Sequence, residues 1–269
     1  MESTKEVKTM LQEDDIILNL LSAIVEALGR TDRKHPLGKL YLSEIILCGV
    51  LFALKGGSFR RFHPWLLKRN ILNLPERSRL CRLLIKYKKL CNKFLSSETF
   101  FNVIDSFGVE VIHPAREGRS EQSQKVSRKG KSNHRWIIGR KINVTINGEL
   151  EIVDFQENTA NVCDNNFDDE YAQKEEYLYL TDNGYRKQEK HGGTPINFKI
   201  CRSGTWNERM WIERLFSLWT RICGMKHSFH RSVKGFQAKV AYLVALTNIV
   251  FRLNESLGFT KCSLVQWAL

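Results

Sequence analysis

The chain has 269 residues, of which 42% are hydrophobic and 26% are charged, a composition typical of a folded globular protein and not of a disordered one. Its 42 lysines and arginines outnumber its 29 acids, giving a formal net charge of +13. Because such an excess repels itself, it favours a polyanionic partner, and we expect nucleic acid rather than a membrane. The longest apolar run, residues 45–54, is shorter than the roughly 20 residues that cross a bilayer. We therefore expect a cytoplasmic protein.

The first hundred residues are predicted to form helices. An apolar period of three to four residues starts after Asp14 and Asp15 and stops at Gly29. A second helix is predicted over residues 43–55, and a third helical segment runs from Pro75 to about residue 94.

The third helical segment carries a row of cations beside its apolar row. Each apolar residue of this row directly follows a cation, and these cations are Arg79, Arg82, Lys86, Lys89 and Lys93. The alternative interpretation is a solvated face on which long side chains cover apolar surface. Residues 55–69 add five cations and no acid. We therefore predict that residues 1–98 form a helical DNA-binding domain, which contacts the DNA through Arg79, Arg82 and Lys86.

From residue 99 the pattern becomes that of strands. Runs rich in β-branched and aromatic residues predict strands over residues 99–104, 136–146, 150–155 and 177–180. Helices are predicted over residues 167–175, 206–223 and 234–253. The mixture predicts a second domain, residues 99–269, with an α/β fold in which helices flank a mixed sheet.

Two aspartates follow predicted strands. Asp105 comes directly after the first strand, and Asp182 comes directly after the fourth. Because α/β sheets bind ligands at the carboxyl ends of their strands, we expect these two side chains to converge. The alternative for Asp182 is a turn-forming role ahead of Asn183 and Gly184. Asp154 and Asp164 are further candidates for the same acidic cluster.

Glu213 lies among apolar residues of the predicted helix over residues 206–223. A carboxylate buried there needs a cation. Arg209, one helical turn earlier, offers an internal ion pair, and the other interpretation is a metal ion shared with Asp105 and Asp182.

Five blocks of the sequence resemble the bacterial insertion-sequence DDE transposases, which have a ribonuclease-H-like catalytic core. The blocks start at Asp105, Lys129, Glu157, Leu180 and Gly204 and read DSF, KGKSNHRWIIG, ENTANVCD, LTDNGY and GTWNERMWIE. In that family the first acid ends the first strand, the second ends the fourth strand and the third lies on a later helix. The resemblance covers residues 37–255 and implies that Asp105, Asp182 and Glu213 are the catalytic, metal-binding acids.

One part of the family pattern differs. Many of these enzymes carry Tyr, Arg, Glu and Lys around the third acid, whereas here Arg209 and Glu213 match and the other two positions hold Trp206 and Thr220. Arg221, next to Thr220, is a possible substitute for the Lys. The difference puts in doubt the DNA-gripping role of the flanking positions and leaves the three acids intact.

The resemblance implies a transposase that cleaves double-stranded DNA at the ends of an element and transfers the freed 3′ ends to target DNA. It also implies two Mg²⁺ ions, with Mn²⁺ as a substitute, a homodimer on the DNA ends, and a place at the bacterial nucleoid. Further DNA contacts are predicted from the basic segment between the first two strands and from two later segments: Lys129, Lys131, Asn133, His134, Arg135, Arg209, Lys226, His230, Arg231 and Lys234. That basic segment also runs into Arg140 and Lys141. A surface or structural role is the alternative for His134 and His230.

Three other interpretations stay open. A metal-dependent nuclease of the same fold would cut DNA without joining it. A catalytically inactive derivative would only bind DNA, and a scaffold for membranes or polyanions would need no paired acids. The helical front domain favours a transposase over the nuclease, which the sequence otherwise separates poorly, and the complete set of three acids argues against an inactive derivative.

Overall fold

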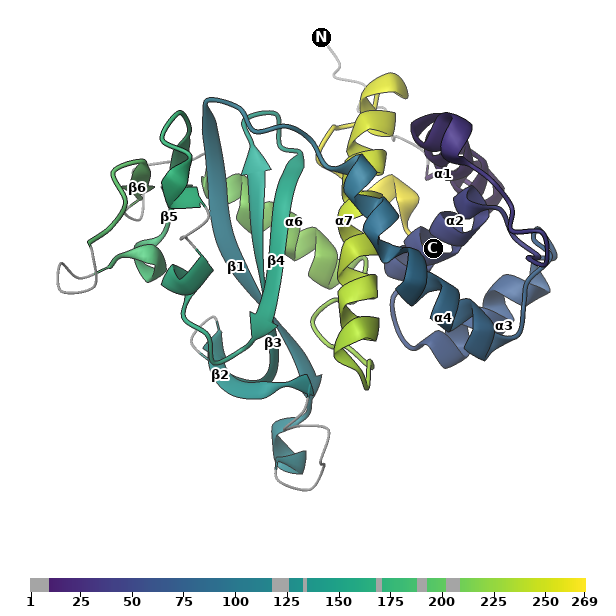
Figure 1. Ribbon diagram of the computed structural model, residues 1–269, viewed down its shortest axis with the longest axis horizontal. Helices are drawn as coiled ribbons and strands as arrows, with labels where there is room; N and C mark the ends of the chain where they lie inside the picture. The colour runs from purple at the N-terminus through teal and green to yellow at the C-terminus, as the bar shows by residue number, and fades with distance from the viewer. Residues whose placement is uncertain (1–9, 118–125, 133–134, 168–170, 188–192, 202–208) are drawn as a thin grey trace, which may run out of the picture.

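The structure is a computed structural model that describes residues 10–117, 126–132, 135–167, 171–187, 193–201 and 209–269 (Figure 1). The helices are α1 (Glu13–Leu28), α2 (Leu42–Lys55), α3 (Phe59–Lys68), α4 (Arg77–Tyr87), α6 (Met210–Arg221) and α7 (Val233–Ser256). The strands are β1 (Phe101–Ile112), β2 (Arg128–Ser132), β3 (Arg135–Asn147), β4 (Ile152–Thr159), β5 (Leu178–Thr181) and β6 (Phe198–Ile200). Short 3₁₀ turns connect them, the longest being Lys88–Phe94.

These strands form one mixed sheet. Its order is β2-β3-β1-β5-β6, and β4 also pairs with β3. The pairs among β1 to β4 are antiparallel, whereas β5 joins β1, and β6 joins β5, in parallel. Helix α6 packs on the sheet through Phe216, whose ring stacks on Phe107 of β1 with centroids 5.1 Å apart. A mixed sheet flanked by helices and preceded by a helical region confirms the predicted α/β fold class.

Helix α7 lies between the sheet and the helices α1 to α4 (Figure 1). It is buried along most of its length, and Gly49 of α2 lets the two helices approach closely, because a Cβ at Gly49 would lie 2.3 Å from the ring of Tyr242. α7 is long and apolar enough to cross a membrane, but 83% of its most apolar window is buried inside the protein, as in a core helix. The four N-terminal helices therefore share one apolar core with a helix of the second predicted domain. The functional boundary at residue 98 stays a prediction.

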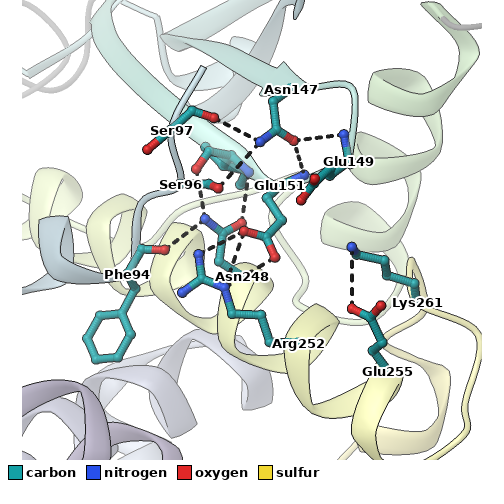
Figure 2. A network of polar contacts seen from close by, with 11 residues as sticks. Phe94, Ser96, Ser97, Asn147, Glu149, Glu151, Asn248, Arg252, Glu255 and Lys261 are labelled. Carbon is teal, nitrogen blue, oxygen red and sulfur yellow. Dashed lines mark hydrogen bonds and ion pairs between the residues drawn. The ribbon is translucent and has the colours of Figure 1, made fainter. Parts of the chain in front are cut away.

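A buried polar junction ties α7 to both halves of the molecule (Figure 2). The side-chain amide of Asn248 donates hydrogen bonds to the carbonyl oxygens of Phe94, at 2.9 Å, and Ile152, at 2.7 Å. Its carbonyl oxygen accepts from the backbone N–H of Ile152 at 2.8 Å. One turn later, Arg252 pairs with the buried carboxylate of Glu151 at 2.8 Å. The end of the helical region and the start of β4 are thus held to the same face of α7.

Several elements differ from the sequence-based expectation. Strand β1 is longer than predicted, and α3, β2 and β6 were not predicted. α3 contains Pro64 and β2 is mostly polar, so neither has a regular apolar pattern. The α-helix predicted over residues 167–175 is wrong where the structure describes that segment, which forms the 3₁₀ turns Asp164–Phe167 and Tyr171–Gln173.

Candidate active site

Asp105 lies inside a strand and not at the end of one. β1 continues to Ile112 because its antiparallel pairing with β3 continues well beyond Asp105, so the prediction that the first strand ends at this acid is wrong. What ends nearby is the parallel pairing of β1 with β5, whose last pair is Val103 with Leu180. Asp105 therefore lies just beyond the point where β5 stops pairing with β1.

Asp182 follows β5 directly, as predicted. Asp105 and Asp182 each come two residues after the last paired positions, so the register places them side by side on one face of the sheet. This register places the two acids near each other, as the sequence predicted, and the charge of Asp182 contributes to the raised pKa of Asp105. Asp182 also forms a turn, since its Oδ1 accepts a hydrogen bond from the Gly184 N–H at 2.8 Å.

The two carboxylates are unfavourable as a charged pair. The Asp105 side chain is 16% exposed, and burial, followed by the proximity of Asp182, raises the pKa of Asp105 to about 7. Burial, and then the charge of Asp164, raises the pKa of Asp182. Such a pair is stabilised by a proton or by a bound cation.

Arg209, at the start of α6, joins the third acid to the first. Its Nη1 lies 3.5 Å from Oδ2 of Asp105, and its Nη2 contacts Oε1 of Glu213 one helical turn later. The Glu213 side chain is 49% exposed, so the expectation that apolar neighbours bury it is wrong. Those neighbours, among them Ile212 and Phe216, point into the core, whereas Glu213 lies on the more exposed side of the helix.

The acids provide suitable donors for a divalent cation. Carboxylate oxygens are the ligands that Mg²⁺ prefers in proteins, and Asp105 with Asp182 supplies two such groups. Among the residues that the structure describes, no three His, Cys, Asp or Glu side chains already stand as a metal-binding group. Instead, the Arg209 guanidinium supplies positive charge between Asp105 and Glu213. The donor chemistry of Asp105 and Asp182 therefore fits a divalent ion, whereas Glu213 is engaged by Arg209.

The two spare acids have different places. Asp164 contributes to the acidic cluster, because its charge raises the pKa of Asp182 after burial, and it is paired with Lys141 at 2.9 Å. Asp154 lies on the other face of the sheet: it pairs in register with Thr145, opposite Ile104, and accepts a hydrogen bond from the Tyr171 hydroxyl. Asp154 is therefore outside the acidic cluster.

Apart from Arg209, which is partly buried and contacts Asp105 and Glu213, the predicted DNA-binding cations are exposed where the structure describes them. This holds for Arg79, Arg82, Lys86, Lys129, Lys131, Arg135, Lys226, Arg231 and Lys234. Asn133, His134 and Trp206 lie outside the described residues. Arg140 and Lys141 are buried in β3, where they pair with Glu157 and Asp164, so they do not belong to the exposed basic segment.

His230 differs from the other predicted contacts. It is only partly exposed, and its ring packs edge-on against Phe52 with centroids 5.9 Å apart. Burial, and then the nearby charge of Lys239, lowers the pKa of His230 to about 4. The imidazole is therefore neutral at pH 7 and offers a phosphate no net charge.

Sequence reasoning missed the pair of Asp164 with Lys141. The two residues are far apart in the chain, and only the antiparallel sheet places Lys141 near the turn that carries Asp164. Asp164 was visible as the last residue of the ENTANVCD block, but no local pattern identifies its cation.

Residues 95–191 match a family model described as Transposase DDE domain. The match includes Asp105, Asp164 and Asp182 and stops before Arg209 and Glu213. Comparison with curated proteins and with solved structures finds no match.

Proposed function

We propose that the chain cuts DNA at the ends of a mobile element and transfers the cut strand to target DNA, because residues 95–191 match the transposase DDE domain model. The observation that carries the proposal is the pair of Asp105 and Asp182, in register at the point where β5 leaves β1. Burial of two acids beside each other is costly, and such perturbed carboxylates are typical of functional sites.

Asp105, Asp182 and Glu213 would together hold the divalent metal, Mg²⁺ or Mn²⁺, in a two-ion site. When bound, the metal ions offset the negative charge that builds on the attacking and leaving oxygens of a phosphodiester. Asp105, which is 16% exposed and lies beside Asp182, would contribute its carboxylate to both ions. Once Glu213 turns to the metal, Arg209 is free to hold a phosphate oxygen of the DNA.

The exposed cations support double-stranded DNA as the substrate, both at the element ends and at the target. Arg79, Arg82 and Lys86 on α4 belong to the region that we propose as the DNA-docking domain, residues 1–98. Lys129 and Lys131 on β2, and Lys226, Arg231 and Lys234 near the start of α7, are also exposed and would add phosphate contacts. A homodimer that pairs two element ends at the bacterial nucleoid completes the proposal.

The test is strand cleavage of duplex DNA that carries the sequences flanking the coding region, in Mg²⁺ or Mn²⁺. Asp182→Ala should bind this DNA as tightly as the native chain and cut none of it. Asp154→Asn is the matched control, because Asp154 is a carboxylate of the same sheet on the opposite face, and it should cut normally.

The outcomes separate the alternatives. Cleavage with joined products supports the transposase, whereas cleavage that never yields joined products favours a nuclease of the same fold. If the native chain and Asp182→Ala both bind DNA and neither cuts it, the inactive DNA-binding derivative is the better account.

A further inference from the structure

A second feature of the molecule is a cleft of about 1000 Å³ that is separate from the acidic site. Its walls come from the start of α3, from the end of β1, and from the loop between α6 and α7. Glu110, in the β1 wall, follows Asp105 by five residues, which at about 3.4 Å per residue is a separation of about 17 Å. That length corresponds to about five base steps of duplex DNA.

The cleft is lined by cations. Arg60, Arg116 and Arg231 belong to its three different walls. The acid in the lining is Glu110, whose carboxylate lies 3.6 Å from His227 and 3.8 Å from Arg135. Because basic groups face that carboxylate, the cleft as a whole attracts an anion.

Phe229 presents an aromatic ring in this basic setting. It lines the cleft and is 65% exposed. The loop that carries it is held to β1 by two backbone hydrogen bonds, from the Glu110 N–H to Lys226 O at 3.1 Å and from the Ser228 N–H to Glu110 O at 2.8 Å. An exposed aromatic ring on a fixed loop beside arginines is the arrangement on which unpaired nucleic-acid bases stack.

The floor of the cleft has hydrogen-bonding groups without partners. Ser228 is 2% exposed, and its Oγ forms no hydrogen bond within the part of the chain that the structure describes. The same holds for Nε2 of His230, whose imidazole is neutral at pH 7 because burial lowers its pKa to about 4. Buried polar atoms are rarely left unpaired in folded proteins, and both of these belong to residues that line the cleft, so a polar ligand bound there is a candidate partner for them. Neutral hydroxyl and imidazole groups suit the edge of a base.

We propose that this cleft binds an unpaired stretch of a DNA strand, with a base stacked on Phe229 and the flanking phosphates at Arg60, Arg116 and Arg231. Its volume is at the upper end of the range for small-ligand pockets, which admits one or a few nucleotides. The inference rests on the proposed function and adds to it a site that is specific for a single strand. Unpairing of the DNA near the element end would supply the ligand.

The test measures the affinity of the full-length protein for two fluorescein-labelled DNAs by fluorescence anisotropy. One is a single strand of about 15 nucleotides, which is enough to cover one site, and the other is the duplex of the same sequence. Phe229→Ala should weaken single-strand binding about tenfold and change duplex binding less than about twofold. Phe229→Trp should keep single-strand affinity. Phe100→Ala removes an aromatic ring that is 75% exposed outside the cleft lining and is the matched control.

A 2-aminopurine base in the single strand gives a second readout, because its fluorescence is quenched when it stacks. Quenching by the native chain and by Phe229→Trp, but not by Phe229→Ala, supports the proposal. Equal losses of single-strand and duplex affinity in Phe229→Ala, or no loss at all, overturn it while leaving the transposase proposal standing. A Phe229-dependent preference for single-stranded RNA over DNA also overturns it. If the native chain binds neither form of DNA, the proposed function itself fails.

Discussion

Arg209 places its Nη1 3.5 Å from Oδ2 of Asp105, so a residue at the start of α6 neutralises an acid in the middle of β1. The same guanidinium contacts Glu213. In a site proposed to hold divalent cations, this arginine provides positive charge between two of the three acids. Metal binding and the Arg209 contacts therefore compete for the same oxygens.

Arg209→Gln should bind Mn²⁺ more tightly than the native chain, because a competing positive charge is removed. A partly exposed ion pair contributes about 1 kcal/mol, which corresponds to about fivefold in affinity. Titration calorimetry of the two proteins measures the difference. Arg221→Gln, on the exposed end of the same helix, is the control and should match the native chain. Weaker binding in Arg209→Gln would show that the arginine organises Glu213 for the metal instead of competing with it.

Asp105 should make the metal-free protein less stable as the pH rises. Its pKa in the native state is about 7 against an ordinary value of 3.8, so between these values the native state holds a proton that the unfolded chain has lost. The stability from this proton is fully present below about pH 4 and is lost as pH rises through 7. In urea unfolding with EDTA, the native chain should lose about 2 to 3 kcal/mol more than Asp105→Asn between pH 5 and pH 8. Parallel pH profiles for the two proteins would contradict the burial of this carboxyl group.

The affinity for Mn²⁺ should itself depend on pH, because a carboxylate must lose its proton to bind a metal ion. With the pKa of Asp105 at about 7, binding should be about tenfold weaker at pH 6 than at pH 8. The proximity of Asp182 contributes to that pKa after burial, so Asp182→Asn should show a smaller pH dependence along with weaker binding. Titrations at the two pH values measure both effects. A pH-independent affinity for the native chain would place the metal away from Asp105.

Asn248→Ala should destabilise the whole molecule. The substitution leaves the carbonyl oxygens of Phe94 and Ile152 and the N–H of Ile152 without their partner in a buried place (Figure 2). We expect a loss of about 3 kcal/mol in the free energy of unfolding, measured in urea. Asn19→Ala removes an exposed side-chain hydrogen bond to Asp15 O and should change stability by less than about 0.5 kcal/mol. Equal effects would mean that water replaces the Asn248 amide.

The cations of α4 should contribute to DNA affinity through phosphates. Replacing Arg79, Arg82 and Lys86 together by Ala should weaken duplex binding and reduce the slope of log affinity against log salt by about 2 to 3. A triple substitution of equal charge at Lys199, Arg221 and Lys261 controls for the change in net charge. If both triple variants lower the slope equally, the effect comes from net charge alone, and the cations of α4 do not contact the DNA phosphates directly.

The local signals in the sequence predicted much of the helical part. α1 was recognised because its apolar residues recur with a helical period, and α2 because a continuous apolar stretch follows Ser43 and Glu44. Each helix stops at a glycine, Gly29 or Gly56. Both patterns involve residues that are close together in the chain, so they can be recognised without knowledge of the fold. α3 and β2 lack such signals, and only their packing against distant segments reveals them.

For the acidic site, what the sequence determined and what the tertiary structure decided can be separated residue by residue. The sequence by itself determined that Asp182 follows a strand and that Arg209 and Glu213 are one helical turn apart, since these are relations between close neighbours. Tertiary structure alone decided that Asp105 lies inside β1 beside Asp182, that Glu213 is half exposed, and that Arg209 also reaches Asp105. The reason is physical: strand register and the packing of α6 on the sheet depend on contacts between residues far apart in the chain, which no local pattern encodes.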